Sequence, residues 1–159
     1  MRVSVEVAAP AEVVWDLVTD IHDGQTVLPG VVFERRREPD AGGRFGPGLV
    51  WAEHRTRAGR THTDVVRVTD VDEGRAYTVV GDGPGGDAAS TTLWVDPRGP
   101  ARARLGLDLR YRPATRAGRV AAWLARPVAD PPLRRMVRAE LDVLAGEAAR
   151  RHAAGAGAG

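Results

Sequence analysis

The chain has 159 residues, and its 23 basic residues, all of them arginine, exceed its 21 acidic residues by a formal charge of +2. It contains no cysteine, which excludes disulfide bonds, thiolate metal sites and cysteine nucleophiles. A domain of this length buries roughly 70% of its unfolded surface, enough for a core and a cavity. No apolar run approaches the ~20 residues that span a bilayer, and the arginines are scattered. We therefore expect a cytoplasmic protein with no stable membrane insertion and no nucleic-acid partner.

The first part of the chain predicts a strand followed by a helix. Residues Val3 to Val7 alternate apolar and polar side chains, which is typical of a half-buried strand. Pro10 and Glu12 suit the first turn of a helix, and the helical pattern continues to residue 20. The connecting segment that follows has room for one more helical turn, at residues 25–28.

Six further strands are predicted from apolar–polar alternation and from the glycine- and proline-rich turns that separate them. The last predicted strand shows the clearest pattern, because one of its faces is apolar or aromatic and the other is charged. An antiparallel sheet with one face inward and one face in solvent has this pattern. The apolar face carries Ala103, Leu105, Leu107, Leu109 and Tyr111. The six strands cover residues 31–37, 49–57, 60–69, 75–80, 90–95 and 101–112.

The periodicity changes from two to helical near Gly118. A helical turn or two is expected before the chain is interrupted near Pro127 and again at Pro131-Pro132, because proline lacks an N–H donor. A long amphipathic helix is predicted after that, ending near residues 150–151, with a disordered Gly/Ala tail at 153–159. Its apolar stripe consists of Leu133, Met136, Val137, Leu141, Leu144, Ala145 and Ala148.

Several motifs, in order along nearly the whole chain, resemble the START-like, helix-grip (SRPBCC) superfamily, most closely its polyketide cyclase/dehydrase and lipid-transport branch. The resemblance implies a single ligand-binding domain over residues 1–152. It implies an α+β helix-grip fold, in which a curved seven-stranded antiparallel sheet wraps around a long C-terminal helix, with one or two short helices after the first strand. The motifs are AAPAEVVWDLVTD at residues 8–20, Leu28–Val31, Gly48–Glu53, Val65–Val79 and the last helix with Leu141 and Glu147.

The resemblance also implies a cavity between the sheet and the last helix that encloses one small hydrophobic or aromatic molecule. Three functions remain open: cofactor-free polyketide cyclisation or dehydration, non-catalytic carriage or sensing of a lipid or quinone, and a co-chaperone-like interaction module. The third would show a filled core in place of a cavity. The sequence assigns no oligomeric state. The expected cavity walls are Phe33, Trp51, Val66, Leu105, Leu107, Leu109, Met136, Val137 and Leu141.

A two-residue turn at Ala58-Gly59 predicts the register of one central hairpin. The resulting face is apolar at one end and polar at the other. Its apolar end indicates that the whole face points inward, so the polar end would line the cavity or its mouth. The predicted cross-strand pairs are Leu49–Val68, Trp51–Val66, Glu53–Asp64 and Arg55–His62.

The polar end of this face supplies candidate catalytic residues. Glu53, His62 and Asp64, with Arg55 as the counter-charge, would form a general acid–base set. Tyr111, at the end of the inward face of the last strand, is a further candidate that could orient a substrate carbonyl. Each has a structural alternative, namely a solvent-exposed charge pair at a strand end and a core tyrosine whose hydroxyl reaches water.

Neither metal nor nucleotide chemistry is predicted. The four histidines, at positions 22, 54, 62 and 152, do not form metal-ligand spacing with nearby carboxylates. The glycine-rich segments at residues 42–46 and 81–83 lack the lysine and the following helix of a phosphate-binding loop. We therefore expect no cofactor.

Overall fold

The computed structural model describes residues 1–21, 27–29, 31–36, 45–57, 59–82 and 88–157. Within these residues the chain forms strands and helices in the order β–α, six further strands and a long final helix, as the sequence predicts. Of the short helical turn predicted at residues 25–28, residues 25 and 26 lie outside the described residues, and residues 27 and 28 form a bend and not a helix. The elements are β1 (Arg2–Val7), α1 (Ala11–Thr19), β2 (Val31–Arg36), β3 (Val50–Arg57), β4 (Arg60–Asp72), β5 (Ala76–Asp82), β6 (Ala88–Gly99), β7 (Arg102–Arg112) and α2 (Arg116–Ala156).

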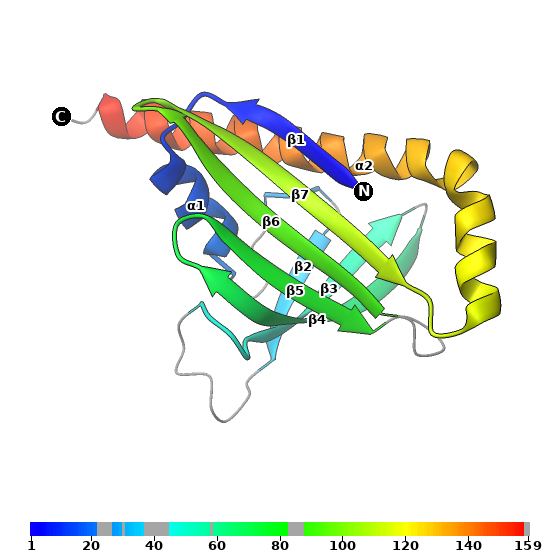
Figure 1. Ribbon diagram of the computed structural model, residues 1–159. Helices are drawn as coiled ribbons and strands as arrows, with labels where there is room; N and C mark the ends of the chain where they lie inside the picture. Colours follow the sequence, from blue (N-terminus) through cyan, green and yellow to red (C-terminus); the bar gives the residue numbers. More distant parts are fainter. Residues whose placement is uncertain (22–26, 30, 37–44, 58, 83–87, 158–159) are drawn as a thin grey trace.

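The strands form one seven-stranded antiparallel sheet in the order β1-β7-β6-β5-β4-β3-β2. Figure 1 shows this sheet curving around α2, with α1 beside the C-terminal half of α2. The α+β helix-grip fold predicted from the resemblance is therefore confirmed. The inner face of the sheet and the two helices enclose the space in which the core and the cavity lie.

The β3–β4 hairpin has the register that a two-residue turn requires. Glu53 lies opposite Asp64, and Arg55 lies opposite His62. Gly59 has a φ of +74°, a left-handed conformation that glycine adopts without steric cost. This turn therefore fixes which side chains of β3 and β4 share the inner face.

The final helix is longer than the sequence predicts. It begins at Arg116, where the Thr115 hydroxyl accepts a hydrogen bond from the Gly118 N–H at 2.9 Å, and it continues to Ala156. The predicted interruptions at Pro127 and at residues 131–132 do not end it. Figure 1 shows instead a bend between the first turns of α2, in yellow, and the remainder, in orange. Prolines bend a helix where their missing N–H removes a backbone hydrogen bond.

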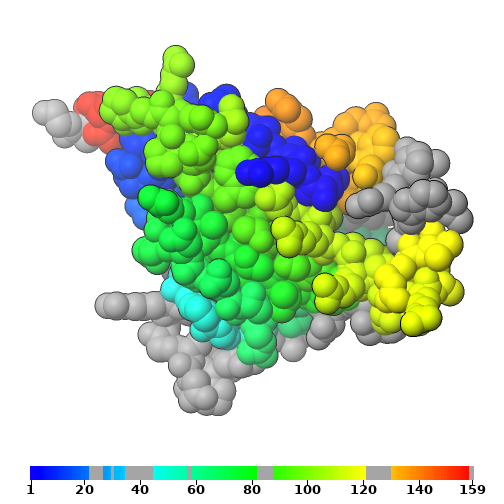
Figure 2. Space-filling model, in the orientation of Figure 1, coloured from blue at the N-terminus to red at the C-terminus, as the bar shows by residue number. Residues whose placement is uncertain are grey.

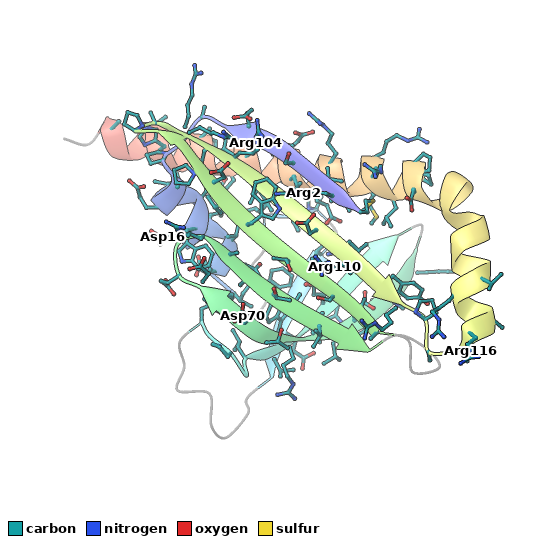
Figure 3. All side chains as sticks on the ribbon, viewed as in Figure 1. Arg2, Asp16, Asp70, Arg104, Arg110 and Arg116 are labelled. Carbon is teal, nitrogen blue, oxygen red and sulfur yellow. The ribbon has the colours of Figure 1, made fainter. Side chains whose placement is uncertain are left out.

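The outer face of the sheet, which points away from α2, is covered by packed side chains (Figure 2). Trp94 of β6 lies over Gly106 of β7, where any larger side chain would collide with the indole, and the Arg2 guanidinium lies 4.5 Å from the centre of the Trp94 ring. Figure 2 shows side chains of β1, β5, β6 and β7 filling this face, and Figure 3 shows Arg2, Arg104 and Arg110 on the same side. Within the described part of the chain, no helix is long and apolar enough to cross a membrane.

Candidate functional site

A cavity of about 750 Å³ lies between the inner face of the sheet, α1 and α2. Its walls are mainly apolar, because the alternating strands turn their apolar side chains toward the apolar stripe of α2. Eight of the nine side chains that the sequence suggests as walls line it. They are Phe33, Trp51, Val66, Leu107, Leu109, Met136, Val137 and Leu141.

Leu105 differs from the expectation. It shares the inner face of β7 with Leu107 and Leu109, but it is 0% exposed and belongs to the packed core, not to the cavity wall. Leu105 lies opposite Val5 of β1, toward the end of the sheet where α1 packs against β6, β7 and α2. The space under the sheet is therefore filled at this end.

A network of three charged side chains joins β3 to α2 at the cavity. Arg55 donates from Nε and Nη2 to Oε2 of Glu53, at 3.2 and 2.9 Å, and from Nη1 to Oε1 of Glu140 at 2.5 Å. The indole N–H of Trp51 donates to the other oxygen of Glu53 at 3.1 Å. Glu53, Arg55 and Glu140 all line the cavity, and their side chains are only 16, 31 and 27% exposed.

Electrostatics keep the arginine of this network charged. Burial by itself lowers the pKa of Arg55, but the charges and hydrogen bonds of Glu53 and Glu140 outweigh burial and raise the pKa above its ordinary value. Arg55 is thus a permanent cation held between two carboxylates. Within the described part of the chain, three of its five N–H donors bond to these two partners, and the other two can bond to a ligand in the cavity.

The structure places some residues of the predicted acid–base set in the cavity and one outside it. Asp64 lines the cavity beside Glu53, and His62 does not. The His62 ring contacts Asp64 with 3.0 Å between Nε2 and Oδ1, but its side chain is 71% exposed and that of Asp64 is 47% exposed. These two residues form a solvent-exposed pair at the mouth, whereas Glu53 and Arg55 lie inside.

Tyr111 lies away from the cavity. It is 55% exposed and is not among the lining residues, although alternation predicts it on the inward face. The pairing of β1 with β7 extends only as far as Asp108, with Met1 bonding to Leu109. At Tyr111 the strand has a described neighbour on one side only, at Ala89 of β6, so its ring remains open to solvent.

Tyr77 is a polar wall residue that the sequence analysis did not select. It lines the cavity, is 8% exposed, and its hydroxyl donates to the backbone carbonyl of Val18 at 3.2 Å. Burial, and secondarily the charge of Glu53, raises the pKa of Tyr77 well above its ordinary value, so the phenol stays neutral. Tyr77 and Val79 are two residues apart on β5, so their side chains share one face of the strand. This alternation could have predicted that Tyr77 points inward.

Glu140 is a second cavity residue that was not among the candidates predicted from the sequence. It occupies helical positions four residues after Met136 and four before Leu144, so a carboxylate stands within the apolar stripe of α2. A charged residue at such spacing is the signal that could have identified it. The described residues contain no group of three or more His, Asp or Glu side chains that could hold a metal ion.

Residues 1–149 match the family model described as polyketide cyclase / dehydrase and lipid transport. The chain belongs to this family. The match covers β1 through most of α2, so it includes every element that surrounds the cavity. A search of curated protein sequences found no match.

Solved structures share the fold of this polyketide cyclase/dehydrase family member. The Zhui aromatase/cyclase from Streptomyces sp. R1128 is 24% identical, with a TM-score of 0.65 and coverage of 95% of this chain and 93% of that chain. A norcoclaurine synthase from Thalictrum flavum is 18% identical, with a TM-score of 0.67 and coverage of 95 and 94%. A START superfamily protein from Mycobacterium smegmatis is 18% identical, with a TM-score of 0.64 and coverage of 96 and 95%. At these identities the similarity shows the helix-grip fold.

Proposed function

We propose that this protein binds one small hydrophobic molecule, with an aromatic body, between the sheet and α2. The observation that carries the proposal is the cavity of about 750 Å³, a volume typical of small-molecule sites, which are mostly apolar with a few polar groups. The ring of Phe33 packs edge-on against Trp51 in the wall, with 6.3 Å between the centres, a geometry suited to aromatic contacts. A co-chaperone-like module would have a filled core, so the cavity counts against that alternative.

Binding can be tested with a neutral fluorescent probe, N-phenyl-1-naphthylamine, and by native mass spectrometry for a co-purified small molecule. Met136→Trp places a large ring in the cavity wall and should weaken probe binding at least about tenfold, a change of ~1.4 kcal/mol. Val143→Trp is the matched control, because Val143 lies on the same helix, is 37% exposed and does not line the cavity. Equal binding by both variants and the unmodified protein would contradict the proposal.

A catalytic role is a second candidate, carried by the position of the charged network inside the cavity. A remaining N–H of Arg55 could donate to a ketone oxygen and stabilise the enolate that forms when a neighbouring carbon loses its proton to Glu140. The enolate carbon would then bond to a second carbonyl carbon, and the resulting alkoxide would take the proton back from Glu140. Loss of water would complete a dehydration. This is general acid–base chemistry without a cofactor, and it is the reaction class that the family description suggests.

Turnover of a poly-β-ketone substrate tests the catalytic candidate. Arg55→Met and Glu140→Gln should each lower turnover by about 100-fold or more. Glu6→Gln should not change it, because the Glu6 side chain lies on the outer face of β1 and is 61% exposed. His62→Ala should also retain activity, because His62 lies outside the cavity. Tight ligand binding with no turnover in the unmodified protein would favour a carrier.

A further inference from the structure

The polar groups of the cavity are unevenly charged. Its described lining residues include four carboxylates, Asp20, Glu53, Asp64 and Glu140, but only two arginines, Arg55 and Arg151. Arg151 is already paired with Glu147 on its own helix, with 2.8 Å between Nε and Oε1. Among the described lining residues, Arg55 is therefore the arginine whose charge is shared with carboxylates inside the cavity.

The internal network also has more negative than positive formal charge. Glu53 and Glu140 share the one guanidinium of Arg55. Both oxygens of Glu53 accept hydrogen bonds, one from Trp51 and one from Arg55. Glu140 accepts from Arg55 through Oε1 alone among the described residues, so its second oxygen can accept a hydrogen bond from a ligand. An ionised carboxylate only accepts hydrogen bonds.

The register of β3 and β4 places a further carboxylate, that of Asp64, beside this network. Asp64 lies directly opposite Glu53 and lines the same cavity. His62 is its partner on the solvent side, so any counter-charge from the imidazole lies outside the lining residues. A second anionic group entering this region would meet carboxylates on β3, β4 and α2, in an environment that screens charge less than water does.

We infer that the cavity selects ligands whose polar end is a cation or a neutral hydrogen-bond donor, such as an amine or a phenol, and discriminates against ligands that end in a carboxylate. The inference rests on the proposed binding function and narrows its ligand class. The ligand's hydrocarbon or aromatic body contacts the apolar walls, and its polar end contacts Glu140. Fatty acids and other carboxylates of similar size are then poor ligands.

Three ligands with the same aromatic body test this selection in the unmodified protein: 1-naphthylmethylamine, 1-naphthalenemethanol and 1-naphthoic acid. At neutral pH they present an ammonium, a hydroxyl and a carboxylate. The amine and the acid both lose the hydration of a full charge on entering the cavity, so the ratio of their affinities reports the charge of the cavity. Displacement of the neutral fluorescent probe gives the three dissociation constants. We expect the amine to bind at least about tenfold more tightly than the acid, with the alcohol between them.

The variant Glu140→Gln tests whether the preference for the amine over the acid comes from the charged network of Glu53, Arg55 and Glu140. The substitution keeps the size of the side chain and removes one negative charge, so the ratio between the affinities of amine and acid should fall at least about threefold. Glu6→Gln makes the same change of charge on the outer face, where Glu6 pairs with Arg104 at 2.7 Å, and should leave the ratio unchanged.

The outcomes separate the two proposals. Binding of the alcohol together with equal or tighter binding of the acid than the amine overturns the inferred selection and leaves the binding function standing. Failure of all three ligands and of the probe to bind overturns the binding function itself. A ratio that Glu140→Gln and Glu6→Gln change equally shows a general effect of net charge and overturns the assignment to Glu140.

Discussion

Leu105 and Leu109 lie two pleats apart on the inner face of β7, but their surroundings differ. Leu105 is completely buried and belongs to the packed core, and Leu109 lines the cavity. Around Leu105 the space is filled by α1 and by the C-terminal half of α2, where Val14 and Ala148 are also 0% exposed. We call this region the packed end, and the region around Leu109, Met136 and the charged network the open end.

The inner face of the sheet and the apolar stripe of α2 therefore serve two purposes, a packed core at one end and a cavity at the other. At the packed end a second helix, α1, covers the sheet, and Trp15 of α1 is buried with the aliphatic side chains of the core. At the open end the wall includes Glu53, Arg55 and Glu140, groups that are stable only with hydrogen-bonded partners or access to water. Stability should therefore depend mostly on the packed end, and ligand recognition on the open end.

The greatest loss of stability is expected for substitution of Leu105, and substitution of Leu109 provides the comparison. Leu105→Ala should lower the free energy of unfolding by about 3 kcal/mol, because it creates a new void in close-packed surroundings. Leu109→Ala should cost about 1 kcal/mol, because its side chain already borders an open cavity. Urea denaturation measures both values. Equal losses would show that the two ends are equally packed.

A second prediction concerns the charged network. Arg55→Met leaves two largely buried carboxylates, Glu53 and Glu140, without their shared cation, and should lower the free energy of unfolding by about 2 kcal/mol after allowance for their partial exposure. The matched measurement is the double variant Arg55→Met with Glu140→Gln, which should recover part of the loss. No recovery would indicate that Arg55 contributes through packing alone.

Tyr77 gives a pH-dependent prediction at the boundary between the two ends. Its pKa is raised in the folded protein above the unfolded value of 10.0, mainly by burial. Above pH 10 the unfolded chain releases a proton that the folded protein retains, so stability should fall with rising pH by up to about 1.4 kcal/mol per pH unit.

Tyr77→Phe removes this titration and also the hydrogen bond to Val18, at a cost of about 1 kcal/mol at neutral pH. The difference in unfolding free energy between the two proteins should therefore shrink above pH 10, as followed by denaturation at several pH values. The exposed Tyr111 is present in both proteins and cancels. A difference that stays constant through pH 11 would contradict the buried, neutral phenol.

The smallest effect is expected on the outer face. Arg104 pairs with Glu6 at 2.7 Å, but the two side chains are 40 and 61% exposed, so Arg104→Met should change the free energy of unfolding by about 0.5 kcal/mol or less. Compared with Arg55→Met, this isolates the contribution of burial to an arginine–carboxylate pair. Similar losses for the two arginine variants would remove the distinction between the inner and outer faces.

The β3–β4 hairpin shows how far the sequence could predict the site. A turn at Ala58-Gly59 fixes the register because a one-residue shift would move every inward side chain to the outer face, and the structure has that register. Glu53 and Asp64 could therefore be placed on one face before any tertiary contact was known. His62 shares their alternation but lies nearer the turn, where exposure depends on what packs above the strand.

Contacts between distant segments could not be predicted in the same way. Arg55 and Glu140 are 85 residues apart, and no local pattern states which residue of α2 will face β3. The prolines of α2 predicted interruptions, because a helix interior disfavours proline, but the chain continues as a bent helix to Ala156. The energy of packing the apolar stripe decides whether a local break ends a helix or only bends it.

The order of the strands and helices, the register of the β3–β4 hairpin and the apolar stripe of α2 follow from the amino-acid sequence, because turn chemistry and side-chain periodicity are local. Three features follow from tertiary packing and not from local pattern. Leu105 belongs to the core and Leu109 to the cavity wall, Tyr111 is exposed to solvent, and Arg55 lies between Glu53 and Glu140. These features depend on where α1 stops covering the sheet and on which turn of α2 meets β3. Both are settled by packing between segments far apart in the chain.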